Sequence, residues 1–142
     1  MKAQGFSTWT GNWKEGTGTI STASLSLASQ AYSYASRFEG TPGASPEELL
    51  AAAHAGCFNQ ALANNFGMQS LTAQAIDTAV IIDLGQDEQG RPAILGSHIV
   101  VAARVAGATP EQLQQCATRA STNCSISKIM RCPITFEARL LS

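Results

Sequence analysis

The chain has 142 residues, enough for one domain with a sizeable core, and 44% of them are hydrophobic. Charged residues make up only 13%, roughly half of the usual fraction, so part of the surface is expected to be covered, most simply by a second copy of the chain. With a formal net charge of −1, the chain lacks the excess of positive charge expected of a protein that binds nucleic acid or an anionic membrane.

The first ten residues lack the apolar core of a signal peptide, and no segment reaches the roughly 18 apolar residues of a membrane span. We therefore expect a cytoplasmic protein that binds neither membrane nor nucleic acid and whose four cysteines stay mostly reduced. No internal repeat or interdomain linker is visible, so a single domain over residues 1–142 is expected.

The first 40 residues are rich in Gly, Ser and Thr and predict short antiparallel strands. Residues 6–10 and 16–22 show the alternation typical of strands. The pair Gly11-Asn12 between them favours a turn.

A long helix is predicted next. Ser45 suits the N-cap, Pro46 the first helical position, and Glu48 completes a capping box. Residues 49–66 are almost free of charge, which indicates a helix buried over most of its circumference. Gly67 is expected to end it.

The second half of the chain predicts a hairpin, a helix and a final strand. Residues 75–84 and 94–105 form the hairpin about the polar turn 85–92, and residues 134–140 alternate as the last strand. Residues 109–112 repeat the signals of a helix start. One face of this second helix is expected to be apolar, and it comprises Leu113, Cys116, Ala117, Ala120 and Cys124. The order β-β-β-α-β-β-α-β predicts an α+β fold with two main helices packed on antiparallel sheets.

Two cysteines are the most informative residues. Cys57 and Cys124 are each expected in an apolar helix and are 67 positions apart, so only the fold can bring their thiols together. Two lone thiols in a chain so poor in charge indicate sulfur redox chemistry.

Three blocks of the sequence make the chain similar to the OsmC/Ohr family, and within it to the OsmC branch. They are residues 36–40 with Arg-Phe-Glu, residues 45–57 with Pro-Glu-Glu-Leu and Ala-His-Ala-x-Cys, and residues 124–128. The last block reads Cys-Ser-Ile-Ser-Lys where the family usually has Cys-Pro-x-Ser. Each block is weak alone, but together they follow the family's order and spacing along nearly the full length.

The resemblance implies an intertwined homodimer and an antioxidant, thiol-dependent peroxidase that reduces organic hydroperoxides and, more weakly, hydrogen peroxide. Cys57 matches the cysteine that attacks the peroxide, and Cys124 matches the one that resolves it as a disulfide. Arg37 and Glu47 match the ion pair that prepares the thiolate. The implied reductant is an external thiol, with dihydrolipoyl groups as the donor, and no metal or bound organic cofactor is implied.

This chemistry suits the matched residues. A free cysteine with a pKa of about 8.5 is mostly protonated at neutral pH, and an arginine near Cys57 would favour the reactive thiolate. The same arginine could stabilise the departing alkoxide. Attack on the O–O bond leaves a sulfenic acid, with which Cys124 could condense.

Helix geometry adds a constraint on assembly. Glu47 and Cys57 are ten residues apart on the first predicted helix, a rise of about 15 Å at 1.5 Å per residue. A glutamate at the helix start cannot easily act beside that cysteine. Two such helices crossing antiparallel in a dimer would bring Glu47 of one chain near Cys57 of the partner subunit, so we expect active sites shared between subunits.

Several residues have an alternative interpretation as ordinary structure. Cysteine is among the most buried residue types, so Cys116 and Cys132 are expected to be packing residues. His54, one turn before Cys57, could be a ligand or base but is better explained as a satisfied helix histidine. Ser125 replaces the family's proline, which is expected to loosen the turn and slow disulfide formation, and Cys132 is therefore an alternative resolving thiol.

Two other classes of function remain open. His54, Cys57, Cys124 and a further cysteine could form a metal-binding module, although the chain has no Cys-x2-Cys pair of the kind common in zinc sites. The chain could also be a non-catalytic binding protein that has kept the fold and lost turnover.

Overall fold

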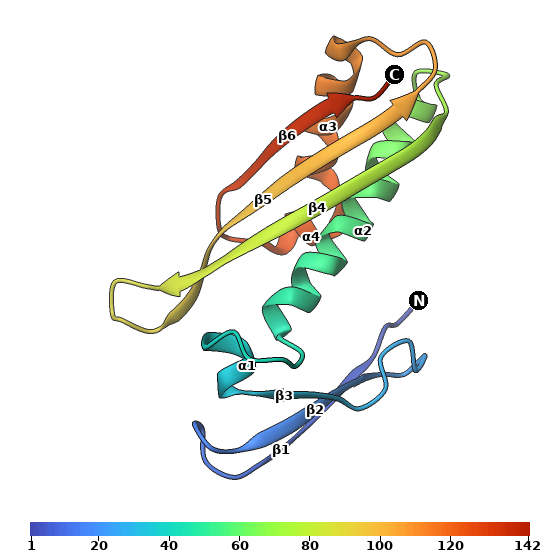
Figure 1. Cartoon of the computed structure of the whole chain (residues 1–142). Coiled ribbons are helices and arrows are strands. Elements are labelled where there is room, and N and C mark those ends of the chain that lie inside the picture. The colour runs from blue at the N-terminus through green and yellow to red at the C-terminus, as the bar shows by residue number, and fades with distance from the viewer. The chain divides into compact units, whose positions relative to one another are not determined.

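The computed structural model describes residues 1–142, which divide into two compact units, Met1–Leu49 and Leu50–Ser142 (Figure 1). The first unit contains strands β1 (Gly5–Thr10), β2 (Thr17–Thr22) and β3 (Gln30–Ser33), which pair antiparallel in that order. The short helix α1 (Tyr34–Phe38) follows β3 directly. The predicted strands and the turn after Gly11 are confirmed, and Gly11 has the positive φ of 96° that such a turn favours.

The second unit is built on the sheet of β4 (Ala73–Gln86), β5 (Pro92–Val105) and β6 (Ile134–Leu140). The predicted hairpin between β4 and β5 is confirmed, and both strands run two residues further into the turn than expected. The expectation of purely antiparallel sheets is wrong for β6, which pairs parallel to β5. The chain between these strands passes through helices and returns to the same end of the sheet, as parallel pairing requires.

Three helices accompany this sheet: α2 (Pro46–Gly67), α3 (Pro110–Asn123) and α4 (Ser125–Ile129). The bounds of α2 agree with the prediction, and Thr109 caps α3 in a capping box with Gln112 as expected. The placement of Cys124 inside a helix is wrong, because this residue ends α3 and is the N-cap of α4. The sequence pattern did not indicate α1 and α4, since five residues are too few to show a helical period.

The core of the second unit lies on one face of its sheet. Side chains at alternate positions of β5, including Ile99 and Val101, are buried together with Phe58 and Leu62 of α2 and Leu113 of α3. Helices α2 and α3 lie on the same side of this sheet (Figure 1). The core therefore holds α2 by one helical face against β5.

The expectation that α2 is buried over most of its circumference is wrong for the chain by itself. Its buried residues are His54, Phe58, Leu62, Asn65 and Phe66, which recur at helical spacing along one face. The opposite face is uncharged and rich in small residues, namely Ala52, Ala53, Gly56, Gln60, Ala63 and Asn64, all exposed. A Cβ atom added at Gly56 would meet no neighbour within 4 Å.

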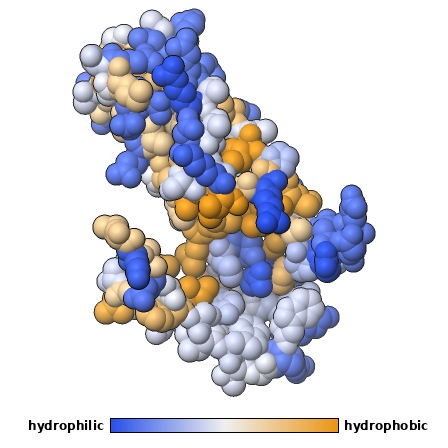
Figure 2. Space-filling view, turned by 180° about the vertical axis from the view of Figure 1, so that it is seen from behind, coloured by the Kyte–Doolittle hydropathy of each residue, from blue (hydrophilic) through white to orange (hydrophobic).

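Large apolar side chains are exposed in both units. They include Phe6, Trp13 and Leu25 in the first unit and Met68, Ile81, Leu95 and Ile129 in the second. Figure 2 shows one face of the molecule, on which hydrophobic residues, in orange, form patches. None of the helices is long and apolar enough to cross a membrane.

Candidate active site

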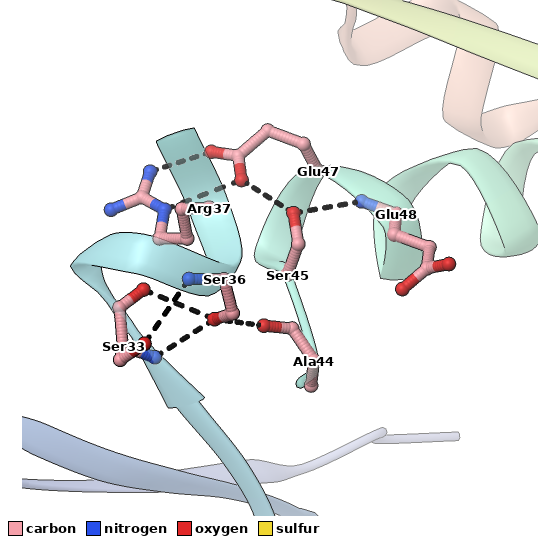
Figure 3. A network of polar contacts seen from close by, with 7 residues as sticks. All are labelled: Ser33, Ser36, Arg37, Ala44, Ser45, Glu47 and Glu48. Atoms are coloured by element: carbon pink, nitrogen blue, oxygen red, sulfur yellow. Dashed lines mark hydrogen bonds and ion pairs between the residues drawn. The ribbon is translucent and has the colours of Figure 1, made fainter. Parts of the chain in front are cut away.

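The structure places the four predicted site residues in two separate pairs, one in each unit. In the first unit, Arg37 of α1 and Glu47 in the first turn of α2 form a two-point ion pair (Figure 3). Arg37 Nη2 lies 2.5 Å from Glu47 Oε1, and Arg37 Nε donates to Glu47 Oε2 over 3.3 Å. Ser45 donates from its hydroxyl to the same Oε2 over 2.9 Å.

The charges of this pair are mutually stabilised. The hydrogen bond to Glu47 raises the pKa of Arg37 above its usual value. Burial alone would raise the pKa of Glu47, but the hydrogen bonds from Arg37 and Ser45 outweigh it, and the net shift is downward. Both groups therefore stay charged at neutral pH, and the guanidinium keeps a fixed direction.

Serine side chains near α1 hold this pair in place. Ser33 caps α1 and exchanges hydrogen bonds with Ser36, whose hydroxyl also donates to the Ala44 carbonyl over 2.8 Å (Figure 3). The latter bond ties α1 to the segment that leads into α2. Only half of the predicted capping box at Ser45 forms: the Glu48 N–H donates to the Ser45 hydroxyl, but the Glu48 carboxylate does not accept from the Ser45 N–H. The Ser45 hydroxyl donates to Glu47 instead.

In the second unit, Cys57 of α2 faces the start of α4. Its Sγ lies 3.3 Å from the hydroxyl oxygen of Ser125. Burial raises the pKa of Cys57, but four donors together outweigh it and lower the pKa below the usual value: the Ser125 hydroxyl, the Ile126 N–H, the Cys124 thiol and the Ser125 N–H. Donors that bond the charged form of a thiol favour the thiolate, which is the nucleophilic form.

Cys124 lies beside Cys57 at the junction between α3 and α4, and neither forms a disulfide. Its side chain is 3% exposed. As the N-cap of α4, Cys124 accepts a hydrogen bond from the Ser127 N–H at 3.3 Å, and its sulfur lies 3.0 Å from the Ser127 hydroxyl oxygen. The fold thus places two free thiols next to each other, which the sequence separation alone could not establish.

His54 lies wholly inside the second unit, one turn before Cys57. Its Nδ1 is 2.9 Å from the Ser97 hydroxyl oxygen and its Nε2 is 2.8 Å from that of Ser127. Burial lowers the pKa of His54, so the ring is neutral at physiological pH. The interpretation as a satisfied helix histidine is confirmed.

The residues that a metal site would need do not converge. The structure contains no group of three or more His, Cys, Asp and Glu side chains that could hold a metal ion. Both ring nitrogens of His54 are hydrogen-bonded to serines rather than directed to a thiol. The arrangement therefore gives no support to the metal-binding alternative.

The other two cysteines have different surroundings. Cys116 is completely buried in the core, where burial raises its pKa and Gln69 donates a hydrogen bond to its sulfur over 3.3 Å. Cys116 is therefore a packing residue, as predicted. Cys132 is half-buried between α4 and β6 and lines a 240 Å³ cavity, whose other lining residues are Leu50, Ile94, Ile129, Met130 and Arg131.

Sequence reasoning missed three serines of this site. The sequence alone identifies Ser125 only as a departure from the family's proline, yet it supplies Cys57 with a hydroxyl and an N–H donor, neither of which proline has. Ser127 belongs to a family block, so its position was a usable signal. Ser97 gives no local signal, because it meets His54 across 43 positions of sequence.

Ser125 generates a prediction about the charge state of Cys57. Ser125→Ala removes one donor and Ser125→Pro removes two, and proline suits the first position of α4. We expect the pKa of Cys57 to rise in the order native, Ser125→Ala, Ser125→Pro. The measurement is the pH dependence of Cys57 alkylation, followed by peptide mass mapping. Equal pH profiles for all three proteins would contradict this assignment.

Comparison with known proteins places these residues in a family. Residues 38–139 match the OsmC family, described as OsmC-like protein. The chain is 35% identical over 134 residues to peroxiredoxin OsmC of Escherichia coli strain K12, covering 94% of this chain and 93% of the relative. In fold it is similar to an OsmC-like protein of unknown function from Vibrio cholerae (TM-score 0.78, 15% identity, 98% and 99% of the two chains). It is likewise similar to the organic hydroperoxide resistance protein OhrB of Bacillus subtilis (TM-score 0.70, 21% identity, 99% and 98%). The chain belongs to the OsmC family.

Proposed function

We propose that this protein is a thiol-dependent peroxidase that reduces organic hydroperoxides, with Cys57 as the nucleophile. The observation that carries the proposal is the surroundings of Cys57: donors at the start of α4 stabilise its thiolate, and a second free thiol lies beside it. The peroxiredoxin name of the 35% identical relative supports the same activity.

The reaction balances with the residues present. The Cys57 thiolate attacks one peroxide oxygen, the O–O bond breaks, and the departing alkoxide takes a proton and leaves as an alcohol. Cys57 is then a sulfenic acid. Cys124 condenses with it to form a disulfide and water, and an external dithiol reduces that disulfide. We propose dihydrolipoyl groups as this donor.

A cavity in the first unit supports a preference for organic peroxides. It has a volume of 270 Å³, and its lining residues are Trp9, Trp13, Tyr32, Ser33, Tyr34, Arg37 and Phe38. The rings of Trp13 and Tyr34 lie 4.8 Å apart edge to face, and the Arg37 guanidinium lies 4.8 Å from the centre of the Phe38 ring. An apolar substituent would bind the aromatic wall, while Arg37 would stabilise charge on the peroxide oxygen.

The arrangement of α2 supports a homodimer with shared sites. Glu47 and Cys57 belong to the same helix, and the ten residues between these positions correspond to a rise of about 15 Å along its axis. The side chains on the exposed face of α2 are uncharged and mostly small, which allows a second helix to approach closely. We propose that the Arg37–Glu47 pair of one chain serves Cys57 of the partner subunit.

The first test is peroxide consumption. The native protein should consume cumene hydroperoxide faster than hydrogen peroxide with dihydrolipoamide or dithiothreitol as reductant. Cys57→Ser should consume neither, because a hydroxyl is not ionised at neutral pH, and Cys116→Ser serves as the matched control. Substantial turnover by Cys57→Ser would remove this residue from the mechanism, and an inactive native protein would leave the non-catalytic alternative.

The second test identifies the resolving thiol. One equivalent of hydroperoxide should yield a Cys57–Cys124 disulfide, found by peptide mass mapping, because Cys57 contacts Ser125, the residue next to Cys124. Cys124→Ser should react once and then over-oxidise to the sulfinic acid under excess peroxide. A dominant Cys57–Cys132 linkage would overturn the role of Cys124 and leave the peroxidase activity standing.

The third test addresses shared sites. Cys57→Ser and Glu47→Ala subunits should each be nearly inactive, whereas a 1:1 mixture that exchanges subunits at random should regain up to about a quarter of the native activity, since half of its dimers are heterodimers. The reason is that one of the two sites in a heterodimer would contain both intact residues. Heterodimers demonstrated by mass spectrometry that remain inactive would show that each site lies within one chain.

A further inference from the structure

A continuous line of buried, hydrogen-bonded groups connects Ser97 to Cys124. Ser97 of β5 bonds His54 Nδ1 over 2.9 Å, His54 Nε2 bonds Ser127 over 2.8 Å, and the Ser127 hydroxyl lies 3.0 Å from Cys124 Sγ. His54 and Ser97 are 0% and 2% exposed, and Cys124 and Ser127 are 3% and 6% exposed. Cys124 in turn lies beside Cys57, whose pKa its side chain helps to lower. The whole line lies within the second unit and joins β5, α2 and α4.

Counting the available protons shows which partner donates in each of these hydrogen bonds. Cys124 attacks as a thiolate, whose sulfur has no proton and can only accept hydrogen bonds. In that state the bond of 3.0 Å between Cys124 and Ser127 must be donated by the Ser127 hydroxyl. Ser127 has then used its only proton and accepts from His54 Nε2–H, so the neutral ring has no proton on Nδ1 and accepts there from Ser97.

The consequence concerns Cys124, the resolving thiol of the proposed function on which this inference rests. Its sulfur receives two hydrogen bonds, one from the Ser127 N–H and one from the Ser127 hydroxyl. Two donors stabilise negative charge on a sulfur, and aligned hydrogen bonds polarise one another in a buried site. Without His54, the Ser127 hydroxyl would be free to rotate away from Cys124.

We propose that His54 is a positioning residue for disulfide formation: through its Nε2–H it orients the Ser127 hydroxyl toward Cys124 and so stabilises the charge that develops on Cys124 as it attacks the oxidised Cys57. In that step the S–S bond forms and the S–O bond of the Cys57 sulfenic acid breaks. The proton of Cys124 goes to the departing oxygen, which leaves as water. The Cys57 sulfur is reduced and the Cys124 sulfur is oxidised, while His54 and Ser127 keep their protons.

The geometry separates this role from that of a general base. Neither ring nitrogen of His54 bonds a thiol, since both bond serine hydroxyls. The ring acts through Ser127 alone, so its effect should be confined to Cys124. The reaction of Cys57 with an external reagent should not depend on it.

The test isolates the attack of Cys124 without any peroxide. Dithiobisnitrobenzoate reacts with Cys57 and releases one thionitrobenzoate at a rate that depends on reagent concentration. Cys124 then displaces the second thionitrobenzoate from Cys57 at a rate that is independent of reagent concentration. A Cys132→Ser background removes the other half-buried thiol, and stopped-flow absorbance resolves the two steps.

Two substitutions of His54 form a matched pair. The amide of glutamine reaches the position of Nε2, which faces Ser127, whereas the amide of asparagine reaches only that of Nδ1, which faces Ser97. We expect His54→Asn and Ser127→Ala to slow the second step on the order of tenfold, the effect of one lost hydrogen bond to a charged sulfur. His54→Gln and Ser127→Thr should restore it to within about threefold of native, and the first step should change little in all four variants.

Three outcomes would overturn the proposal: an unchanged second step in Ser127→Ala, equal losses in His54→Gln and His54→Asn, or parallel losses in both steps. Parallel losses would mean that the substitutions only loosen the fold, which thermal unfolding of each variant would report. Because no peroxide is used, a native protein without peroxidase activity would overturn the proposed function and leave this measurement valid.

Discussion

The contact between the Cys57 sulfur and the first turn of α4 is the interaction on which the rest of the candidate site depends. Every helix start presents N–H groups without intrahelical partners, and here those of Ser125 and Ile126 are directed to a cysteine of another helix. Cys124 ends α3 and caps α4, so the same break in the chain that exposes these donors also places the second thiol. A continuous helix through residue 124 would remove both effects at once.

The line of hydrogen-bonded groups that ends at Cys124 accounts for one buried histidine, His54, and two buried serines, Ser97 and Ser127. Buried polar groups are costly unless they are hydrogen-bonded, and each ring nitrogen of His54 has a partner. The partners come from β5 and α4, so the line also fixes these elements relative to α2. Substitution of any one member by an apolar residue would leave the next member unpaired, which makes the line sensitive as a unit.

The ion pair of the first unit is built differently. Arg37 and Glu47 are held by a two-point ion pair and a serine hydroxyl, and the guanidinium lies against the Phe38 ring in an aromatic cavity. All six residues of β1 are exposed, as is one uncharged face of α2. A second copy of the chain would cover such surfaces, so the sparse charge of the sequence and the exposed surfaces have the same explanation in the proposed homodimer.

The sequence by itself determined the α+β class, the bounds of α2, the start of α3, the hairpin of β4 and β5, and the family. These features depend on local signals: Pro46 and Thr109 at helix starts, strict alternation in strands, and three motif blocks in order. Only the tertiary structure decided that β6 runs parallel to β5, that Cys124 lies between two helices, and that Ser125, Ser127 and Ser97 surround the cysteines and His54. The physical reason is distance along the chain. A hydrogen bond between His54 and Ser97, or between Cys57 and Ser125, joins residues 43 and 68 positions apart, and no local propensity of a serine records what it will meet.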